Sequence, residues 1–246
     1  MSFPPSQLIV PSPETGTDYH VTIASPDPAG QPGPWRVLFV LDADDHFGVA
    51  LDAYRGWWAR GEARPLLLVG VGYGAGFKQP GNRRIRDFTP RVVDDEPESG
   101  GAEPFHAFLT QTLWPRVADM YPVISDDPAI AGHSLGGLFV LHAIFRAQPF
   151  FRRGLAAAPS VWWDDEAILR VIARFRAAHP ALPARLFMTV GESDTESMQR
   201  VFAEFERQLA EQPFEDLRVR TQRFPGRGHF NVVPVAYEAG LRALYG

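Results

Sequence analysis

The stretch Ile130-Ala131-Gly132-His133-Ser134-Leu135-Gly136-Gly137 organises the rest of the chain. An apolar run ends at Ala131, the motif G-x-S-x-G follows with Ser134 at its centre, and residues 138–147 form an apolar segment typical of a helix. This order of strand, sharp turn and helix is what a nucleophile elbow requires. A Cβ two residues before or after the serine would collide with the neighbouring backbone, and glycine tolerates the strained dihedral angles of such a turn. We therefore predict that the Ser134 hydroxyl stands clear at the C-terminal edge of a sheet, beside free N–H groups of the next helix.

The motif by itself is weak evidence, because a glycine-rich loop between a strand and a helix produces G-x-S-x-G by chance. Two further observations strengthen it here. The apolar flanks fit the elbow, and acidic residues and a histidine follow in the chain order that a serine nucleophile of this kind requires. We therefore interpret Ser134 as a candidate nucleophile.

The composition limits the class of protein. The chain has 246 residues, 45% of them hydrophobic, which is enough to bury a large core in a single domain over residues 1–246. A net charge of −5 argues against nucleic acid as the main partner. The lack of cysteine excludes disulfides, thiolate catalysis and cysteine-ligated metals.

This sequence shows no pattern typical of a secretory signal or of a membrane span. The opening residues Met1-Ser2-Phe3-Pro4-Pro5 have neither the basic start nor the apolar run of a secretory signal. No apolar run approaches the ~20 residues of a membrane span. We expect a cytoplasmic protein with no membrane partner.

Strands and helices alternate along most of the chain. Strands are predicted at residues 19–23 (an edge strand), 36–41, 66–71, 154–158, 185–190 and 218–224. Helices are predicted at residues 51–60, 103–121 with a kink or break at Pro115, 166–178, 196–209 and 234–244. This alternation predicts an α/β fold with a mostly parallel central sheet and helices on both of its faces. A long polar loop covers residues 78–101, and whether it closes as a lid stays open.

His229 is the candidate general base. A serine hydroxyl needs a base to take its proton, and in proteins with this elbow the histidine follows the serine and the acid in the chain. Of the seven histidines, His229 alone lies C-terminal to both candidate partners, in a short loop after the last predicted strand. His133, beside the serine, is expected to pack under the turn.

The candidate acid lies in the loop after the strand at residues 185–190. Asp194 is favoured because its place in the loop lets it turn back toward a histidine, and Glu192 is the alternative. Asp, Ser and Thr at this position would also cap the following helix without taking part in chemistry.

An oxyanion hole needs two N–H donors. Leu135, directly after the nucleophile, is expected to supply one, and the loop at Ala43 and Asp44 the other. The acidic residues in that loop lack the glycine and the glutamate of a calcium loop, so we predict no metal site there.

The basic run Arg83-Arg84-Ile85-Arg86, with Arg91, allows two interpretations. It could bind an anionic ligand, or it could be a solvated loop face paired with the acidic residues 94–96.

Five segments of the sequence form a recognisable set: Val40-Leu41-Asp42-Ala43-Asp44, Arg84-Ile85-Arg86-Asp87-Phe88-Thr89-Pro90, Gly132-His133-Ser134-Leu135-Gly136-Gly137, Ala158-Pro159-Ser160-Val161-Trp162-Trp163 and Gly228-His229. With them the chain resembles the α/β-hydrolase-fold esterases of the esterase D and ferric-siderophore esterase type. Many hydrolases share the elbow, whereas the second and fourth segments are more particular to this group. Ala43 stands where the group usually has glycine.

The resemblance implies roles for individual residues. Ser134, Asp194 and His229 would form a catalytic triad, and Asp44 would give the second oxyanion N–H. Arg84 or Arg86 and the pair Trp162-Trp163 would lie near the substrate.

The expected reaction is hydrolysis of a small-molecule ester through an acyl-enzyme, without a metal or organic cofactor. Aromatic walls and nearby arginines suit a bulky ester such as a siderophore trilactone. A short-chain carboxylesterase, a thioesterase and an acyltransferase use the same catalytic parts. A catalytically silent protein of this fold that binds a ligand is an alternative from a different class.

Overall fold

The computed structural model describes residues 4–26 and 33–246. The chain divides into two compact units, residues 1–130 (unit 1) and residues 131–246 (unit 2), and each is described by itself. A single domain over the whole chain therefore stays a prediction. Residues 1–3, part of the stretch without a secretory signal, lie outside the described residues.

Four strands lie wholly within the described part of unit 1: β1 (Pro5–Ser12), β2 (Thr17–Ala24), β3 (Arg36–Leu41) and β4 (Leu66–Gly72). β2 pairs antiparallel with β1 and with β4, and β3 pairs parallel with β4. The predicted edge position of residues 19–23 is therefore wrong, because β2 has a partner on each side. β1 is missing from the prediction, since its prolines weaken the strand pattern.

The helices of unit 1 differ more from the prediction than its strands do. α1 (Ala43–Ala59) begins eight residues before the predicted start at residue 51, directly after Asp42, which has a left-handed backbone (φ 52°). α2 (Arg84–Phe88) lies inside the predicted loop at residues 78–101.

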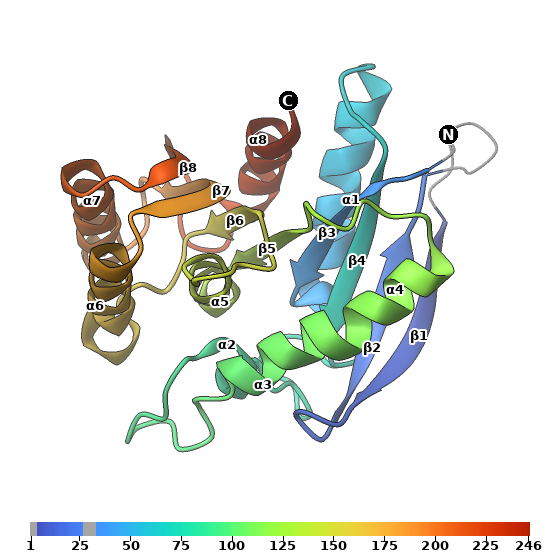
Figure 1. Ribbon diagram of the computed structural model, residues 1–246, viewed down its shortest axis with the longest axis horizontal. Helices are drawn as coiled ribbons and strands as arrows, with labels where there is room; N and C mark the ends of the chain where they lie inside the picture. Colours follow the sequence, from blue (N-terminus) through green and yellow to red (C-terminus); the bar gives the residue numbers. More distant parts are fainter. Residues whose placement is uncertain (1–3, 27–32) are drawn as a thin grey trace. The chain divides into compact units, whose positions relative to one another are not determined.

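The helix predicted at residues 103–121 is a rod of three segments. These are α3 (Ala102–Ala107), the π-helical turn η1 (Phe108–Leu113) and α4 (Trp114–Met120). Pro115 stands at the start of α4, directly after the π-helical turn, which confirms the predicted internal break. Figure 1 shows α3 and α4 in one line across β1 and β2, and η1 contacts β1.

Unit 2 has the alternating pattern that the sequence predicts. β5 (Ala129–His133) enters it and leads into α5 (Leu135–Ile144). β6 (Arg153–Ala157), β7 (Ala181–Gly191) and β8 (Glu215–Phe224) pair in that order, all parallel. The connecting helices are α6 (Trp163–Ala178) and α7 (Glu196–Glu211), and α8 (Val233–Tyr245) follows β8 (Figure 1). The helix predicted from residue 166 starts earlier and irregularly, because Asp164, Asp165 and Glu166 have left-handed backbones.

Helices cover both faces of the β6-β7-β8 sheet. Gly154 of β6 lies against Val140 and Ile144 of α5, whereas its neighbour Leu155 lies against Gly240 of α8. Successive residues of a strand point to opposite faces, so α5 and α8 lie on opposite sides. The C-terminal ends of β5, β7 and β8 lead directly into the three segments that carry Ser134, Asp194 and His229.

Candidate active site

Ser134 stands on a strained turn between β5 and α5. Its backbone has φ 59° and ψ −118°, a region that residues with a side chain rarely occupy. A Cβ on Gly132 would overlap the backbone of Gly136. The predicted collision is therefore confirmed on the side that precedes the serine, and it explains why this position requires glycine.

Backbone hydrogen bonds hold this turn on both sides of the serine. The Ser134 N–H donates to the carbonyl of Ala157 at the end of β6 (3.0 Å). The Ser134 carbonyl accepts from the N–H groups of Leu138 and Ser160, each at 3.0 Å. The strained conformation is thus fixed by its neighbours, which is how a strained residue persists in a folded protein.

The structure brings Ser134, His229 and Asp194 together in series. His229 Nε2 lies 3.0 Å from Ser134 Oγ, and His229 Nδ1 lies 3.0 Å from Asp194 Oδ2. Because an ionised carboxylate only accepts hydrogen bonds, the proton of the neutral ring belongs on Nδ1, and Nε2 is left to accept the serine proton. The Asp194 side chain is 2% exposed, whereas His229 is 24% exposed.

Asp194, and not Glu192, contacts the histidine. Its second oxygen, Oδ1, accepts a hydrogen bond from the N–H of Thr195 (2.8 Å), which orients the carboxylate. Glu192 is exposed. The N-cap of α7 is Thr195, whose hydroxyl accepts from Met198 N–H (3.3 Å), so Asp194 is not the residue that caps this helix.

The loops that carry the acid and the base are joined to each other. Ser193 N–H donates to the carbonyl of Arg227 (2.8 Å), and Gly191 approaches the same carbonyl so closely that a Cβ would overlap it. The Gly228 N–H donates to Asn231 Oδ1 (2.7 Å). These contacts fix the distance between Asp194 and His229 through the backbone.

His133, which the sequence analysis expects to pack under the turn, is buried and contacts the candidate base. It is 3% exposed, and its Nε2 lies 2.7 Å from the carbonyl oxygen of His229. A carbonyl only accepts, so His133 Nε2 carries the proton of this hydrogen bond. The centres of the two rings are 4.7 Å apart.

Aromatic side chains lie on the same unit as the candidate triad. Trp162 is 46% exposed and Trp163 is buried, with ring centres 5.9 Å apart. Phe230, which the sequence analysis missed, is 70% exposed and meets the His229 ring edge-on at 5.2 Å. The sequence signal for Phe230 was an apolar residue directly after the candidate base, in a loop that is otherwise polar.

Arg84 is engaged within unit 1. Its Nε and Nη2 each donate to one oxygen of Asp42 at 3.0 Å, and both side chains are buried. Burial alone would lower the pKa of Arg84, but the Asp42 carboxylate outweighs it and the pKa is raised. The ion pair fixes Asp42, the residue directly before α1, and Asp44 lies in the first turn of that helix.

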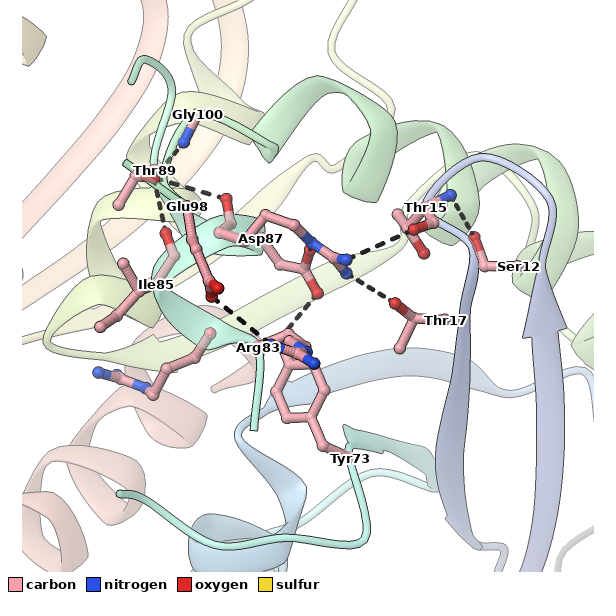
Figure 2. A network of polar contacts seen from close by, with 12 residues as sticks. Ser12, Thr15, Thr17, Tyr73, Arg83, Ile85, Asp87, Thr89, Glu98 and Gly100 are labelled. Atoms are coloured by element: carbon pink, nitrogen blue, oxygen red, sulfur yellow. Dashed lines mark hydrogen bonds and ion pairs between the residues drawn. The ribbon is translucent and has the colours of Figure 1, made fainter. Parts of the chain in front are cut away.

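Arg86 belongs to a buried cluster around Asp87. Asp87 Oδ1 accepts from Arg86 Nε (2.7 Å), and Asp87 Oδ2 accepts from the hydroxyls of Tyr19 (2.7 Å) and Tyr73 (3.1 Å). Figure 2 shows Tyr73 directed at Asp87, and Thr17 facing the same cluster from β2. Burial raises the pKa of Asp87, although its donors oppose the shift.

Three arginines of the basic run have acidic partners. Arg83 pairs with Glu98 (3.5 Å), Arg84 with Asp42 and Arg86 with Asp87. Pairing of the run with residues 94–96 stays a prediction. Contact of Arg84 or Arg86 with a bound ester stays a prediction.

The two expected oxyanion donors both lie in the first turn of a helix, where N–H groups have no acceptor inside the helix. Leu135 opens α5, and Asp44 is the second residue of α1. The Asp44 carboxylate accepts from the N–H of Tyr73 (2.7 Å), which joins the ends of β3 and β4 within unit 1. Their shared role in an oxyanion hole stays a prediction.

The described residues contain neither a cluster of metal-binding side chains nor a helix able to span a membrane. Over residues 4–26 and 33–246, no group of three His, Cys, Asp or Glu side chains is arranged to hold a metal ion. Within the same ranges, no helix has the length and apolar character needed to cross a membrane.

Comparisons with known proteins place the chain in a family. The Esterase family model matches residues 12–230. The ferri-bacillibactin esterase BesA of Bacillus subtilis is 30% identical over 243 residues, which cover 91% of this chain and 83% of that protein.

Solved structures agree on the fold. The BES protein from Bacillus cereus matches with a TM-score of 0.90 and 28% identity, covering all of this chain and 96% of that one. The siderophore hydrolase EstB from Aspergillus nidulans matches with a TM-score of 0.85 and 21% identity, over 100% and 96% of the two chains. The chain therefore has the α/β-hydrolase fold, belongs to the Esterase family and is a carboxylic ester hydrolase of the siderophore-esterase type.

Proposed function

We propose that the ester is cleaved through an acyl-enzyme on Ser134, with His229 as general base and Asp194 as the acid that orients it. The observation that carries this proposal is the pair of 3.0 Å contacts from one imidazole ring, to Ser134 Oγ on one side and to Asp194 Oδ2 on the other. A ring held between a hydroxyl and a carboxylate is the arrangement that activates a serine nucleophile.

The reaction proceeds in two halves. His229 Nε2 takes the Ser134 proton as Oγ attacks the ester carbonyl, and Asp194 stabilises the imidazolium that forms. The imidazolium then protonates the leaving alcohol, and the acyl group stays on Oγ. Water repeats the sequence, with its proton passing to His229 and then to Oγ as the C–Oγ bond breaks. In both halves, the N–H groups of Leu135 and Asp44 are the proposed donors to the oxyanion.

The proposed substrate is a siderophore ester. Relatives named as a ferri-bacillibactin esterase and a siderophore hydrolase support this substrate class. The exposed rings of Phe230 and Trp162 support it as well, because large apolar side chains on the surface mark contact sites for bulky ligands. Arg84, Arg86 and Trp163 complete the proposed substrate-binding set, and the cytoplasm remains the proposed location.

The test compares two groups of substrates with the wild type and Ser134→Ala. The first is a series of p-nitrophenyl esters from C2 to C8, and the second is ferric and iron-free catecholate trilactones. We expect trilactone turnover that falls by about 10³–10⁶-fold in Ser134→Ala. Turnover restricted to short simple esters would reject the siderophore substrate and keep the mechanism. Near-normal turnover by Ser134→Ala would reject the mechanism.

A further inference from the structure

A second buried hydroxyl lies beside the candidate nucleophile. Ser160 Oγ is 3.2 Å from Ser134 Oγ, and Ser160 has no exposed surface. The Ser160 N–H also donates to the Ser134 carbonyl (3.0 Å), so the two serines are linked through both backbone and side chain. A buried hydroxyl normally has a hydrogen-bond partner, and here the partner is the atom that would carry the acyl group.

The segment that carries Ser160 is fixed in place. Ala158, directly after β6, has a left-handed backbone (φ 41°) and is fully buried, and its N–H donates to a backbone carbonyl of β7 (2.8 Å). On its other side, Pro159 lies so close to α5 that a Cβ on Gly137 would come within 2.9 Å of Pro159 Cα. Strain at a buried position that its neighbours determine is typical of functional sites.

The protons available on the two hydroxyls determine which one donates the hydrogen bond and which one accepts it. Ser134 has one hydroxyl proton, and the proposed mechanism requires that it point at His229 Nε2. The Ser160 hydroxyl is then the donor and Ser134 Oγ the acceptor. Ser160 keeps its proton throughout.

We propose that Ser160 is a further catalytic residue, which donates a hydrogen bond to Ser134 Oγ and stabilises the negative charge that this oxygen carries in both halves of the reaction. This inference rests on the proposed acyl-enzyme mechanism. During acylation, Oγ gains charge as its proton moves to His229. During deacylation, Oγ is the leaving group, and charge develops on it as the C–Oγ bond breaks and before His229 returns the proton.

Deacylation should depend on Ser160 more strongly. An ester oxygen is a poor acceptor, whereas an oxygen with developing charge is a strong one, so the Ser160 donor stabilises the second transition state more than the acyl-enzyme. In acylation, Oγ already accepts this hydrogen bond in the free enzyme, so the bond stabilises the first transition state relative to its ground state by a smaller amount.

The test measures the two halves separately in Ser160→Ala. Stopped-flow release of p-nitrophenol from p-nitrophenyl acetate gives the acylation rate, and mass spectrometry of acylated Ser134 after quenching gives the deacylation rate. We expect the deacylation rate to fall by about 10- to 100-fold, acylation to fall less, and the acyl-enzyme to accumulate.

Two further variants separate chemistry from packing. Thr189→Val removes another fully buried hydroxyl of unit 2, one that has no hydrogen-bond partner among the described residues, and it should keep both wild-type rates. Ser160→Cys keeps a side chain of similar shape with a weaker donor, and its deacylation rate should lie between those of the wild type and Ser160→Ala.

Three outcomes would overturn the inference. Unchanged deacylation in Ser160→Ala or Ser160→Cys would show that the hydroxyl does not act on Oγ. Equal losses in Ser160→Ala and Thr189→Val would show that only packing matters. A wild-type enzyme that turns over ester without any acyl group on Ser134 would remove the proposed mechanism and this inference together, whereas either of the first two results leaves the mechanism standing.

Discussion

Two carboxylates, Asp194 in unit 2 and Asp87 in unit 1, are buried to a similar degree but have different hydrogen-bond partners. Asp194 accepts from His229 and from a backbone N–H, and Asp87 accepts from two tyrosine hydroxyls and an arginine. Both side chains are almost completely buried.

The difference lies in what the partners can do with a proton. An imidazole ring exchanges protons near neutral pH, and the His229 side chain is 24% exposed. Burial and the Asp87 carboxylate instead raise the already high pKa values of Tyr19 and Tyr73. Burial would lower the pKa of Arg86, but the Asp87 carboxylate outweighs it and the pKa is raised. In the proposed mechanism, the buried Asp194 therefore supports proton transfer through His229, whereas the buried Asp87 supports the fold.

The largest expected effect is on the catalytic side of this comparison. Asp194→Asn should lower kcat by about 10³–10⁴-fold, because an amide in this place favours the wrong tautomer of His229. Glu192→Gln, in the same loop, is the matched control and should keep wild-type kcat. Steady-state kinetics with p-nitrophenyl acetate measures both. A loss of kcat in Glu192→Gln, with wild-type kcat in Asp194→Asn, would show that Glu192 is the acid of the triad.

A smaller effect on kcat is expected from the residue beneath the base. His133→Ala removes the donor to the His229 carbonyl and should lower kcat by about tenfold, with KM nearly unchanged, because the base loses its position while the substrate surface stays. His133→Gln keeps an N–H donor and should recover part of the loss. A rise in KM with unchanged kcat would place His133 in substrate binding instead.

On the structural side, Asp87→Asn should act on stability. Asp87 accepts on both of its oxygens, whereas an asparagine has one acceptor oxygen and an NH₂ group, so either Arg86 or the two tyrosines lose their acceptor. The free energy of unfolding should therefore fall by about 2–4 kcal/mol, measured by urea denaturation. Because Arg86 belongs to the proposed substrate-binding set and loses the partner that holds it, KM should also rise, while kcat of the folded variant should change little. An unchanged KM would reject a place for Arg86 at the bound ester.

The smallest expected effect is the pH dependence of that stability difference. Because the pKa of Asp87 is raised in the folded state, the folded protein takes up this proton at a higher pH than the unfolded chain does. Asp87 therefore opposes acid unfolding in the window directly above its ordinary pKa. The stability difference between wild type and Asp87→Asn should grow as the pH falls from 7 toward 4, by urea titration at each pH. A difference that shrinks over this range would contradict the raised pKa.

The sequence predicted the parts of the molecule that depend on local pattern. The elbow glycines, the buried strands β3 and β4 and the alternating elements of unit 2 all follow from short-range rules. The chain order of serine, acid and histidine selected Ser134 and His229, and it narrowed the acid to Asp194 or Glu192. The structure brings Ser134, His229 and the favoured Asp194 together.

The features that the sequence analysis did not predict depend on contacts between residues far apart in the chain. β1 forms through its pairing with β2 despite its prolines, and the ion pair of Arg84 with Asp42 joins positions 42 residues apart. Ser160 lies 26 residues from Ser134, and nothing in its local sequence indicates that their hydroxyls meet. The hydrophobic periodicity of the sequence reports local structure and does not indicate which distant residues come into contact.

The central claim is that Ser134 Oγ becomes covalently acylated with help from His229. The most direct measurement is mass spectrometry of the intact, folded enzyme after reaction with a fluorophosphonate probe, followed by peptide mapping, for wild type and His229→Ala. The account predicts one adduct, on Ser134, formed at least about 10³-fold more slowly in His229→Ala. An adduct on another residue, or equal labelling of both proteins, would contradict it.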